Sequence, residues 1–112
     1  MWPIDFTDEY QEWFSSLDEE VREAITSAVM VLSEIGPVLG RPHADQLKGS
    51  SNPKLKELIV QHGGRPIRIA FIFGRNRHGL LLCGGIKDGP KDKQFYPSLI
   101  REAEGLIDRY RP

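Results

Sequence analysis

The first third of the chain has the residue spacing of a short strand followed by two helices. Trp2, Ile4 and Phe6 alternate with polar or turn residues, which is typical of a short strand. Over residues 7–17 and 18–35, apolar side chains recur every three or four positions, so each segment has one apolar helical face. Thr7 and Asp18 stand at the expected N-caps, and each is followed by two acidic residues that favour a helix start.

From residue 55 onward the spacing changes to the alternation that is typical of strands. Three strands joined by tight turns are expected to form an antiparallel meander, because consecutive strands joined this way pair with one another. The strands are predicted at residues 55–60, 65–73 and 80–83, with turns at 61–64 and 75–79.

The remaining segments are predicted to be loops and one last helix. Residues 37–54 are rich in Pro, Gly and Ser and are expected to form a loop, with one turn around Ala44 to Leu47. Gly84-Gly85 is expected to end the third strand, and a polar loop follows at residues 88–93. Residues 95–110 have the apolar face of a helix, with a proline in its first turn.

This order of elements predicts a single α+β domain over residues 1–112: a short N-terminal strand, two helices, a three-stranded antiparallel meander and a C-terminal helix. A chain of 112 residues is an ordinary length for one domain with a small hydrophobic core. We expect the helices to cover one face of the sheet. The other face is then open to solvent and carries Lys56 and Arg68.

The net charge of −1 hides an uneven distribution of charged residues. Residues 1–36 carry nine acids against one base, whereas residues 41–93 carry eleven bases against four acids. A basic segment of this length favours a polyanionic partner such as nucleic acid, and surface pairing between the two segments is the alternative. The chain is otherwise 39% hydrophobic and 28% charged, which is typical of a globular protein and argues against disorder.

The composition favours a cytoplasmic protein that does not enter a membrane. No apolar run approaches the roughly 18 residues that a bilayer-spanning helix needs. The residues after Met1 lack the basic and apolar regions of a secretory signal. The one cysteine, Cys83, cannot form an internal disulfide, which suits a reducing compartment. The three dispersed histidines do not form a metal site.

The candidate chemistry lies in residues 55–96, where basic side chains and one tyrosine come from adjacent strands or from the loop after the third strand. Neighbouring strands lie about 4.8 Å apart, so we expect these side chains to cluster on the open sheet face. Basic groups beside an aromatic ring suit a phosphate backbone with a stacked base, although each one could also serve only solubility. The set comprises Lys56, Arg65, Arg68, Lys87, Lys91, Lys93 and Tyr96.

Two sequence runs resemble a known family: LKELIVQHGGRPIRIAFIF and LLLCGGIKDGPKDKQFY, followed by the C-terminal helix. Together with the two N-terminal helices they resemble the RelE/ParE superfamily of toxins from type II toxin–antitoxin systems, most closely its HigB-like, phage-derived branch. The resemblance implies a RelE-like fold and a ribosome-dependent mRNA endonuclease that inhibits translation without a metal or other cofactor. It also implies a helix-turn-helix antitoxin, the ribosome and mRNA as partners, with operator DNA bound through the antitoxin.

The resemblance further implies roles for individual residues when a 2′-hydroxyl attacks the adjacent phosphate in line. Lys56 corresponds to a strand lysine near the attacking hydroxyl, and Arg68 to an arginine that holds the scissile phosphate. Lys87 matches a basic residue near the leaving group, and Tyr96 matches an aromatic used for stacking or as a proton relay. The other basic residues are expected to position the RNA backbone: Arg65, Lys91 and Lys93.

Two other functions are compatible with the sequence. A ParE-like toxin binds gyrase without catalysis, and the set of Lys56, Arg68, Lys87 and Tyr96 argues against that branch. A degenerate toxin would act only as a binding or co-repressor module with its antitoxin. The near-neutral net charge favours this second alternative, because relatives that cut mRNA are usually strongly basic. Inhibition of DNA supercoiling would identify the first alternative, and expression without growth arrest would identify the second.

Overall fold

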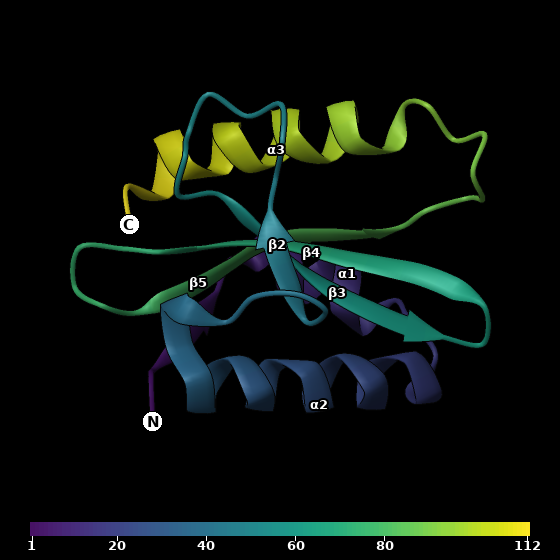
Figure 1. Cartoon of the computed structure of the whole chain (residues 1–112), viewed down its shortest axis with the longest axis horizontal. Helices are drawn as coiled ribbons and strands as arrows, with labels where there is room; N and C mark the ends of the chain where they lie inside the picture. Colours follow the sequence, from purple (N-terminus) through teal and green to yellow (C-terminus); the bar gives the residue numbers. More distant parts are fainter.

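The computed structural model describes residues 1–112 as a five-stranded mixed sheet between two layers of helices (Figure 1). The three central strands form the predicted antiparallel meander in the order β5-β4-β3. At one edge β1 pairs with β5 in parallel, and at the other edge β2 pairs with β3 in antiparallel orientation. The strands are β1 (Ile4–Phe6), β2 (Ala44–Gln46), β3 (Lys56–His62), β4 (Arg65–Phe73) and β5 (Gly79–Ile86).

The three predicted helices are confirmed, and the first two begin at the expected caps. The Thr7 hydroxyl accepts a hydrogen bond from the backbone N–H of Tyr10, and the Asp18 carboxylate accepts one from that of Val21. None of the helices is both long enough and apolar enough to cross a membrane. The helices are α1 (Asp8–Ser15), α2 (Glu19–Ile35) and α3 (Phe95–Tyr110), and a short 3₁₀ turn, η1 (Gly36–Val38), follows α2.

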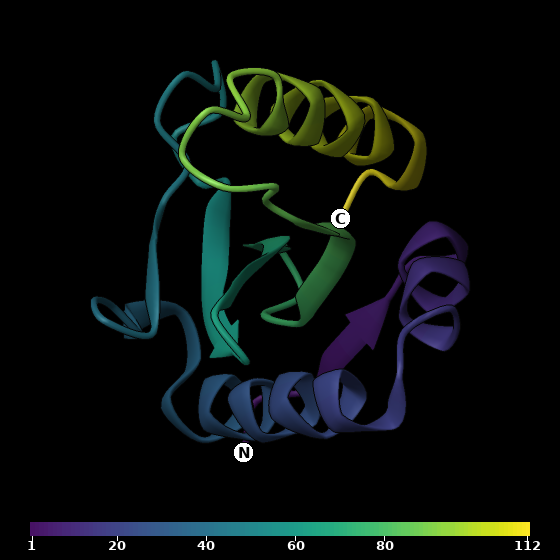
Figure 2. The ribbon, with the colours of Figure 1, turned by 90° about the vertical axis from the view of Figure 1, so that its right-hand side faces the viewer.

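Both faces of the sheet are covered, so the prediction of one open face is wrong. Figure 2 shows α2 and α1 on one side of the sheet and α3 on the other. The reason lies in β4, whose two faces are both apolar: Ile69 and Phe71 point toward α1 and α2, and Ala70 and Ile72 point toward α3. A strand that is apolar on both faces is stable only when both are buried.

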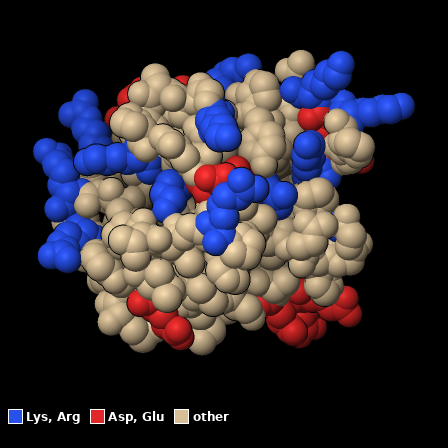
Figure 3. All heavy atoms as spheres, viewed as in Figure 1, with Lys and Arg blue, Asp and Glu red and all other residues tan.

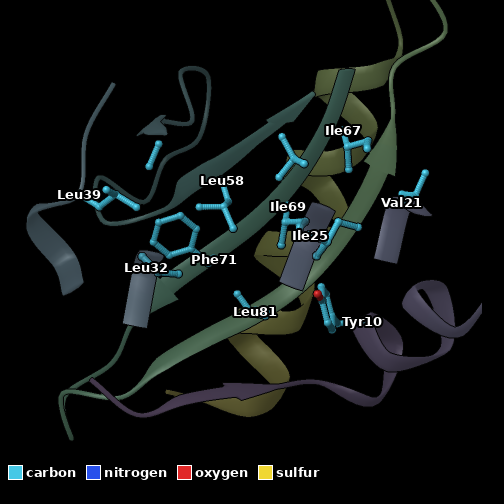
Figure 4. Close-up of a cluster of buried hydrophobic side chains, with 12 residues drawn as sticks. Tyr10, Val21, Ile25, Leu32, Leu39, Leu58, Ile67, Ile69, Phe71 and Leu81 are labelled. Atoms are coloured by element: carbon cyan, nitrogen blue, oxygen red, sulfur yellow. The ribbon is translucent and has the colours of Figure 1, made fainter. Parts of the chain in front are cut away.

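Two hydrophobic clusters therefore hold the three layers together. The cluster between the sheet and α1 and α2 is drawn in Figure 4 and comprises Tyr10, Val21, Ile25, Leu32, Leu39, Ala44, Leu58, Val60, Ile67, Ile69, Phe71 and Leu81. The cluster beneath α3 comprises Leu47, Leu55, Ala70, Ile72, Leu82, Cys83, Leu99, Ile100, Ala103 and Leu106. The second cluster fixes α3 on the sheet, and α3 supplies part of the site described below.

The third meander strand is longer than predicted, because β5 continues through Gly84 and Gly85 to Ile86. The glycines make room for rings from both helical layers. A Cβ at Gly84 would collide with the ring of Trp13 on α1, and a Cβ at Gly85 would lie 3.0 Å from the ring of Phe95 on α3. The glycine pair, expected to end the strand, thus lets two aromatic rings pack on opposite faces of it.

The segment at residues 37–54, predicted to be a loop, contains the short edge strand β2. Its three residues pair with the start of β3, and Asp45 lies opposite Glu57. β3 itself runs on to His62, so the hairpin turn to β4 is only two residues long. Both turn residues, Gly63 and Gly64, have positive φ angles of 59° and 76°, which a two-residue turn of this kind requires.

Candidate functional site

A side chain from each of three elements meets on the α3 side of the sheet. The Tyr96 hydroxyl, from the first turn of α3, donates a 2.8 Å hydrogen bond to Oε1 of Glu57 on β3. Arg68 on β4 donates from Nε to the same hydroxyl at 3.2 Å, and its Nε lies 3.5 Å from Glu57 Oε1. The side chains of Arg68 and Glu57 are only 17% and 11% exposed, so this ion pair is largely shielded from solvent.

The backbone of β3 and β4 fixes the Arg68 guanidinium in place. Its Nη1 donates to the carbonyl oxygens of Ile67 and Val60, at 3.0 and 3.3 Å. Its Nη2 donates no hydrogen bond within the chain, although every buried side-chain nitrogen and oxygen has a partner. Nη2 therefore remains free for a bound anion, and a rigid guanidinium with free N–H groups suits a phosphate oxygen.

Lys87 lies beside this group, at the end of β5. Its backbone N–H donates to the carbonyl of Pro66 at 2.9 Å, which holds the residue beside the start of β4. Its Nζ stands 5.8 Å from the centre of the Tyr96 ring, within the range of a cation–π contact. Three of the four predicted catalytic residues, Arg68, Lys87 and Tyr96, thus lie together.

The surroundings shift the pKa values of the two acidic groups upward. Burial raises the pKa of Glu57 above its ordinary value, and the hydrogen bond from Tyr96 and the charge of Arg68 oppose this only in part. Burial also raises the pKa of the Tyr96 hydroxyl, and its hydrogen bond to Glu57 raises it further. A carboxylate whose pKa is shifted toward neutrality is a better proton acceptor at physiological pH than an ordinary glutamate.

Lys56 lies on the other face of the sheet, so the prediction that it shares a face with Arg68 is wrong. Its Nζ donates to the carbonyl oxygens of Leu39 and Pro37, at 2.6 and 3.1 Å, and lies 5.9 Å from the centre of the Phe71 ring. Burial lowers the pKa of this ammonium group. The contacts give Lys56 a structural role, because they tie the segment after α2 to β3.

The three residues predicted to position RNA are found in two places. Arg65 begins β4 and bonds through Nη2 to the carboxylate of Asp18 at 3.1 Å, at the N-terminus of α2. It is therefore engaged on the face away from Arg68. Lys91 and Lys93 are exposed in the loop between β5 and α3, and neither side chain forms an ion pair.

Glu57 is the functional candidate that the sequence prediction missed. The hairpin register pairs His62 with Arg65 and Ile59 with Arg68. Since alternate residues of a strand share a face, Glu57 rather than Lys56 lies on the face of Arg68. The sequence carried this information, because pairing across either the predicted turn at residues 61–64 or the observed turn at 63–64 places Glu57 on the face of Arg68.

Charge is segregated on the surface, as the sequence distribution predicts. Figure 3 shows acidic side chains gathered along the lower part of the molecule, over α2, and most of the visible Lys and Arg side chains above them. The exposed acids of α2 include Glu19, Glu20 and Glu23. Because α2 and the candidate site lie on opposite faces of the sheet, these acids do not oppose an anion that approaches Arg68 (Figure 2).

The arrangement contains the groups that phosphodiester cleavage by an internal hydroxyl needs. Glu57 can accept a proton, Arg68 offers free N–H groups to a phosphate, and Lys87 adds a second positive charge next to Tyr96. A fixed guanidinium and an ammonium group stabilise the extra negative charge that develops on phosphorus oxygens in the transition state.

Comparison with known proteins identifies similar sequences. Residues 12–108 match the family described as "Phage derived protein Gp49-like (DUF891)". The chain is 36% identical over 96 residues to "Putative toxin HigB2" of Mycobacterium tuberculosis, which covers 85% of this chain and 47% of that protein. It is 37% identical over 94 residues to "Putative toxin HigB3" of the same organism, covering 84% and 80%. The chain thus spans about half the length of the first relative and most of the second.

Solved structures with low sequence identity share the fold. A free-state mutant of the E. coli toxin RelE superposes with a TM-score of 0.68 at 15% identity, over 95% of this chain and 97% of that chain. A chain of the intact E. coli RelBE toxin–antitoxin complex superposes with a TM-score of 0.58 at 12% identity, over 76% of this chain and 95% of that chain. These similarities confirm the RelE-like fold expected from the sequence.

Proposed function

Because the chain belongs to the Gp49-like family of phage-derived proteins and has HigB-like relatives and a RelE-like fold, we propose that it is the toxin of a type II toxin–antitoxin module. In this proposal it is a ribosome-dependent endonuclease that cuts mRNA and stops translation in the cytoplasm. The observation that carries the proposal is the shielded contact of Glu57, Tyr96 and Arg68, with Lys87 beside it.

The proposed reaction is an in-line attack of a ribose 2′-oxygen on the adjacent phosphorus. The new O2′–P bond forms as the P–O5′ bond breaks, which leaves a 2′,3′-cyclic phosphate on one product and a 5′-hydroxyl on the other. The 2′-hydroxyl loses its proton to a base, and the departing 5′-oxygen gains one from an acid. A positioned base or acid typically accelerates such steps by about 10²–10⁴-fold.

Glu57 is the proposed base. Its Oε1 already accepts the Tyr96 hydroxyl, whereas Oε2 accepts no hydrogen bond within the chain and is available for the 2′-hydroxyl. The raised pKa of this carboxylate increases its basicity, and Tyr96 and Arg68 hold it in one orientation. Tyr96 therefore acts on Glu57 as a positioning residue, and it also offers its ring for stacking against a base.

Arg68 and Lys87 are the proposed cationic groups. The free Nη2 of Arg68 would bind an oxygen of the scissile phosphate, and Lys87 would donate its proton to the departing 5′-oxygen. Lys91 and Lys93 would hold the RNA backbone farther along, since both are exposed and unpaired. Lys56 and Arg65 are left out of this arrangement, because each is bonded elsewhere on the opposite face.

The proposed partners follow from the cationic groups of the site and from the fold. A bare cationic site would attract nucleic acid nonspecifically, so a helix-turn-helix antitoxin would mask the site or block entry to the ribosome, and could carry the complex to operator DNA. The solved structure of the RelBE complex supports an antitoxin partner, because a protein of the same fold is seen there in a toxin–antitoxin complex.

Cleavage of a defined message on ribosomes tests the proposal. Purified protein is added to ribosomes programmed with one mRNA, and the cut is mapped by primer extension. We expect cleavage with a cyclic phosphate end, reduced at least 10²-fold by Glu57→Gln or Arg68→Ala. Lys54→Ala, in an exposed residue outside the site, is the matched control, and circular dichroism checks that each variant is folded.

An intact message under conditions that support translation would refute the nuclease proposal. If the same protein then inhibits DNA supercoiling by gyrase, the toxin acts through a protein target instead. If it has neither activity and its expression leaves growth unchanged, it serves only as a binding module.

A further inference from the structure

A groove lies between α3 and the loop that joins β2 to β3. Tyr96 belongs both to its lining and to the candidate site. The groove has a volume of about 480 Å³, comparable with that of a ligand pocket. Its lining includes Lys48 and Gly49 from the loop, and Tyr96, Ile100, Arg101 and Glu104 from α3.

Two contacts set the distance between the loop and the helix. Glu104 accepts hydrogen bonds from the Ser50 hydroxyl at 2.7 Å and from the backbone N–H of Ser51 at 3.0 Å. Gly49 has a φ of +100°, and a Cβ built on it would lie 3.5 Å from Ile100 Cδ1. The loop is therefore held on α3 by its own contacts, so the groove is built into the free protein.

The charges at the groove are mostly positive and unpaired. Lys48 on the loop and Arg101 on α3 are both exposed, and neither forms an ion pair with a carboxylate. The one acidic side chain in the lining, Glu104, is occupied by the loop, and these hydrogen bonds lower its pKa. Two free cations that line one groove suit the phosphates of a single nucleic-acid strand.

We infer that this groove binds the stretch of message that adjoins the cleavage site, with two phosphates other than the scissile one held by Lys48 and Arg101. The inference rests on the proposed function, because the groove shares Tyr96 with the candidate site. Arg68 bonds to the Tyr96 hydroxyl and Tyr96 lines the groove, so the two binding positions are neighbours. Lys48 and Arg101 are thus substrate-binding residues that act on affinity, while Glu104 positions the loop.

The double variant K48A/R101A tests the inference through binding, without any need for cleavage. The probe is a ribosome programmed with a message whose sugars at the codon in the A site are 2′-deoxy, so that it cannot be cut. For single-stranded RNA the salt slope of log K changes by about 0.7 for each phosphate contact, so two lost contacts reduce it by about 1.4. Between 50 and 200 mM salt the wild-type affinity should then fall about sevenfold more than that of the variant.

The control is the double variant K54A/R111A, which also removes one exposed lysine and one exposed arginine but none from the groove. A full salt slope in the control and a reduced one in K48A/R101A support the inference. Equal slopes in wild type and K48A/R101A, or an equal loss in both variants, overturn it. Cleavage of an ordinary message is measured in parallel: wild-type protein that binds through the groove but does not cut would refute the nuclease and leave the groove as an RNA site.

Discussion

Replacing Tyr96 by phenylalanine gives the sharpest test of how the site works, because it removes one oxygen and keeps the ring. The lost hydroxyl donates to Glu57 at 2.8 Å and accepts from Arg68 at 3.2 Å. Its hydrogen bond lowers the pKa of Glu57, against the burial that raises it. Without the hydroxyl, Glu57 should hold its proton to a higher pH, and the acidic limb of the pH–rate profile should move to higher pH.

The magnitude follows from the strength of the lost bond. A hydrogen bond to a charged group contributes about 1.5–3 kcal/mol, and solvent replaces part of it. A remaining difference of about 1.4 kcal/mol changes the equilibrium constant for ionisation of Glu57 tenfold. On the acidic limb, where the rate is proportional to the ionised fraction of Glu57, Tyr96→Phe should therefore cleave about tenfold more slowly. Above the limb, its rate should return to within about threefold of wild type.

The measurement is single-turnover cleavage of ribosome-bound message across a pH series. Tyr110→Phe is the matched control, because its hydroxyl bonds to Glu9 and to the backbone N–H of Asp8, at the surface near α1. A limb that stays in place, or that moves to lower pH, would refute Glu57 as the base. An equal loss at every pH would show that the hydroxyl acts on the substrate and not on Glu57.

Three further predictions concern the scaffold. Lys56→Met keeps the apolar stem but loses hydrogen bonds to two carbonyl oxygens, so it should lower the free energy of unfolding by about 1–3 kcal/mol. The folded variant should cut at the wild-type rate. A large loss of rate at unchanged stability would return Lys56 to the site. Gly84→Ala should lower the free energy of unfolding, measured by thermal denaturation, by about 1–3 kcal/mol, because its Cβ would clash with Trp13. Gly105→Ala, in open space on α3, should raise the same free energy by up to about 1 kcal/mol. Effects of the same sign would contradict the packing. Thr7→Ala removes both the cap of α1 and a 2.6 Å hydrogen bond to a buried carbonyl of β5, so urea denaturation should show a free energy of unfolding that is lower by about 1–2 kcal/mol. Thr7→Ser keeps the hydroxyl and should lose less. Equal losses in the two variants would count against the role of the hydroxyl.

The order of elements was predictable from the sequence because each element has a strong local signal. The capped helices at Thr7 and Asp18 and the alternation over residues 65–73 depend on neighbouring residues alone. β2 was not predictable in this way, since three residues with a central aspartate have no strand pattern and pair only because β3 lies beside them. The two glycines inside β5 were misleading for the same reason, because their explanation is a ring from another layer.

The site was predicted in part, and the error has one physical origin. Arg68, Lys87 and Tyr96 meet as expected, but Lys56 and Glu57 exchange places relative to the prediction. Neighbouring residues of a strand point to opposite faces, so one assignment made without pairing β3 to β4 across the hairpin placed Lys56 where Glu57 lies. The apolar run on both faces of β4 also indicated a second helical layer, and with it a buried ion pair in place of an open cationic surface.

The parallel pairing of β1 with β5 has a consequence for synthesis of the chain. The Thr7 hydroxyl and its acceptor on β5 are 75 residues apart, so the N-terminal segment waits for most of the protein before it can dock. Contacts of such long separation slow folding, because the entropy of closing the loop must be lost before the contact forms. Tyr96 is made later still, and the three-residue contact with Glu57 and Arg68 cannot exist before α3 is complete. During synthesis, Glu57 and Arg68 therefore gain their contact with Tyr96 only after the segment that forms α3 has left the ribosome.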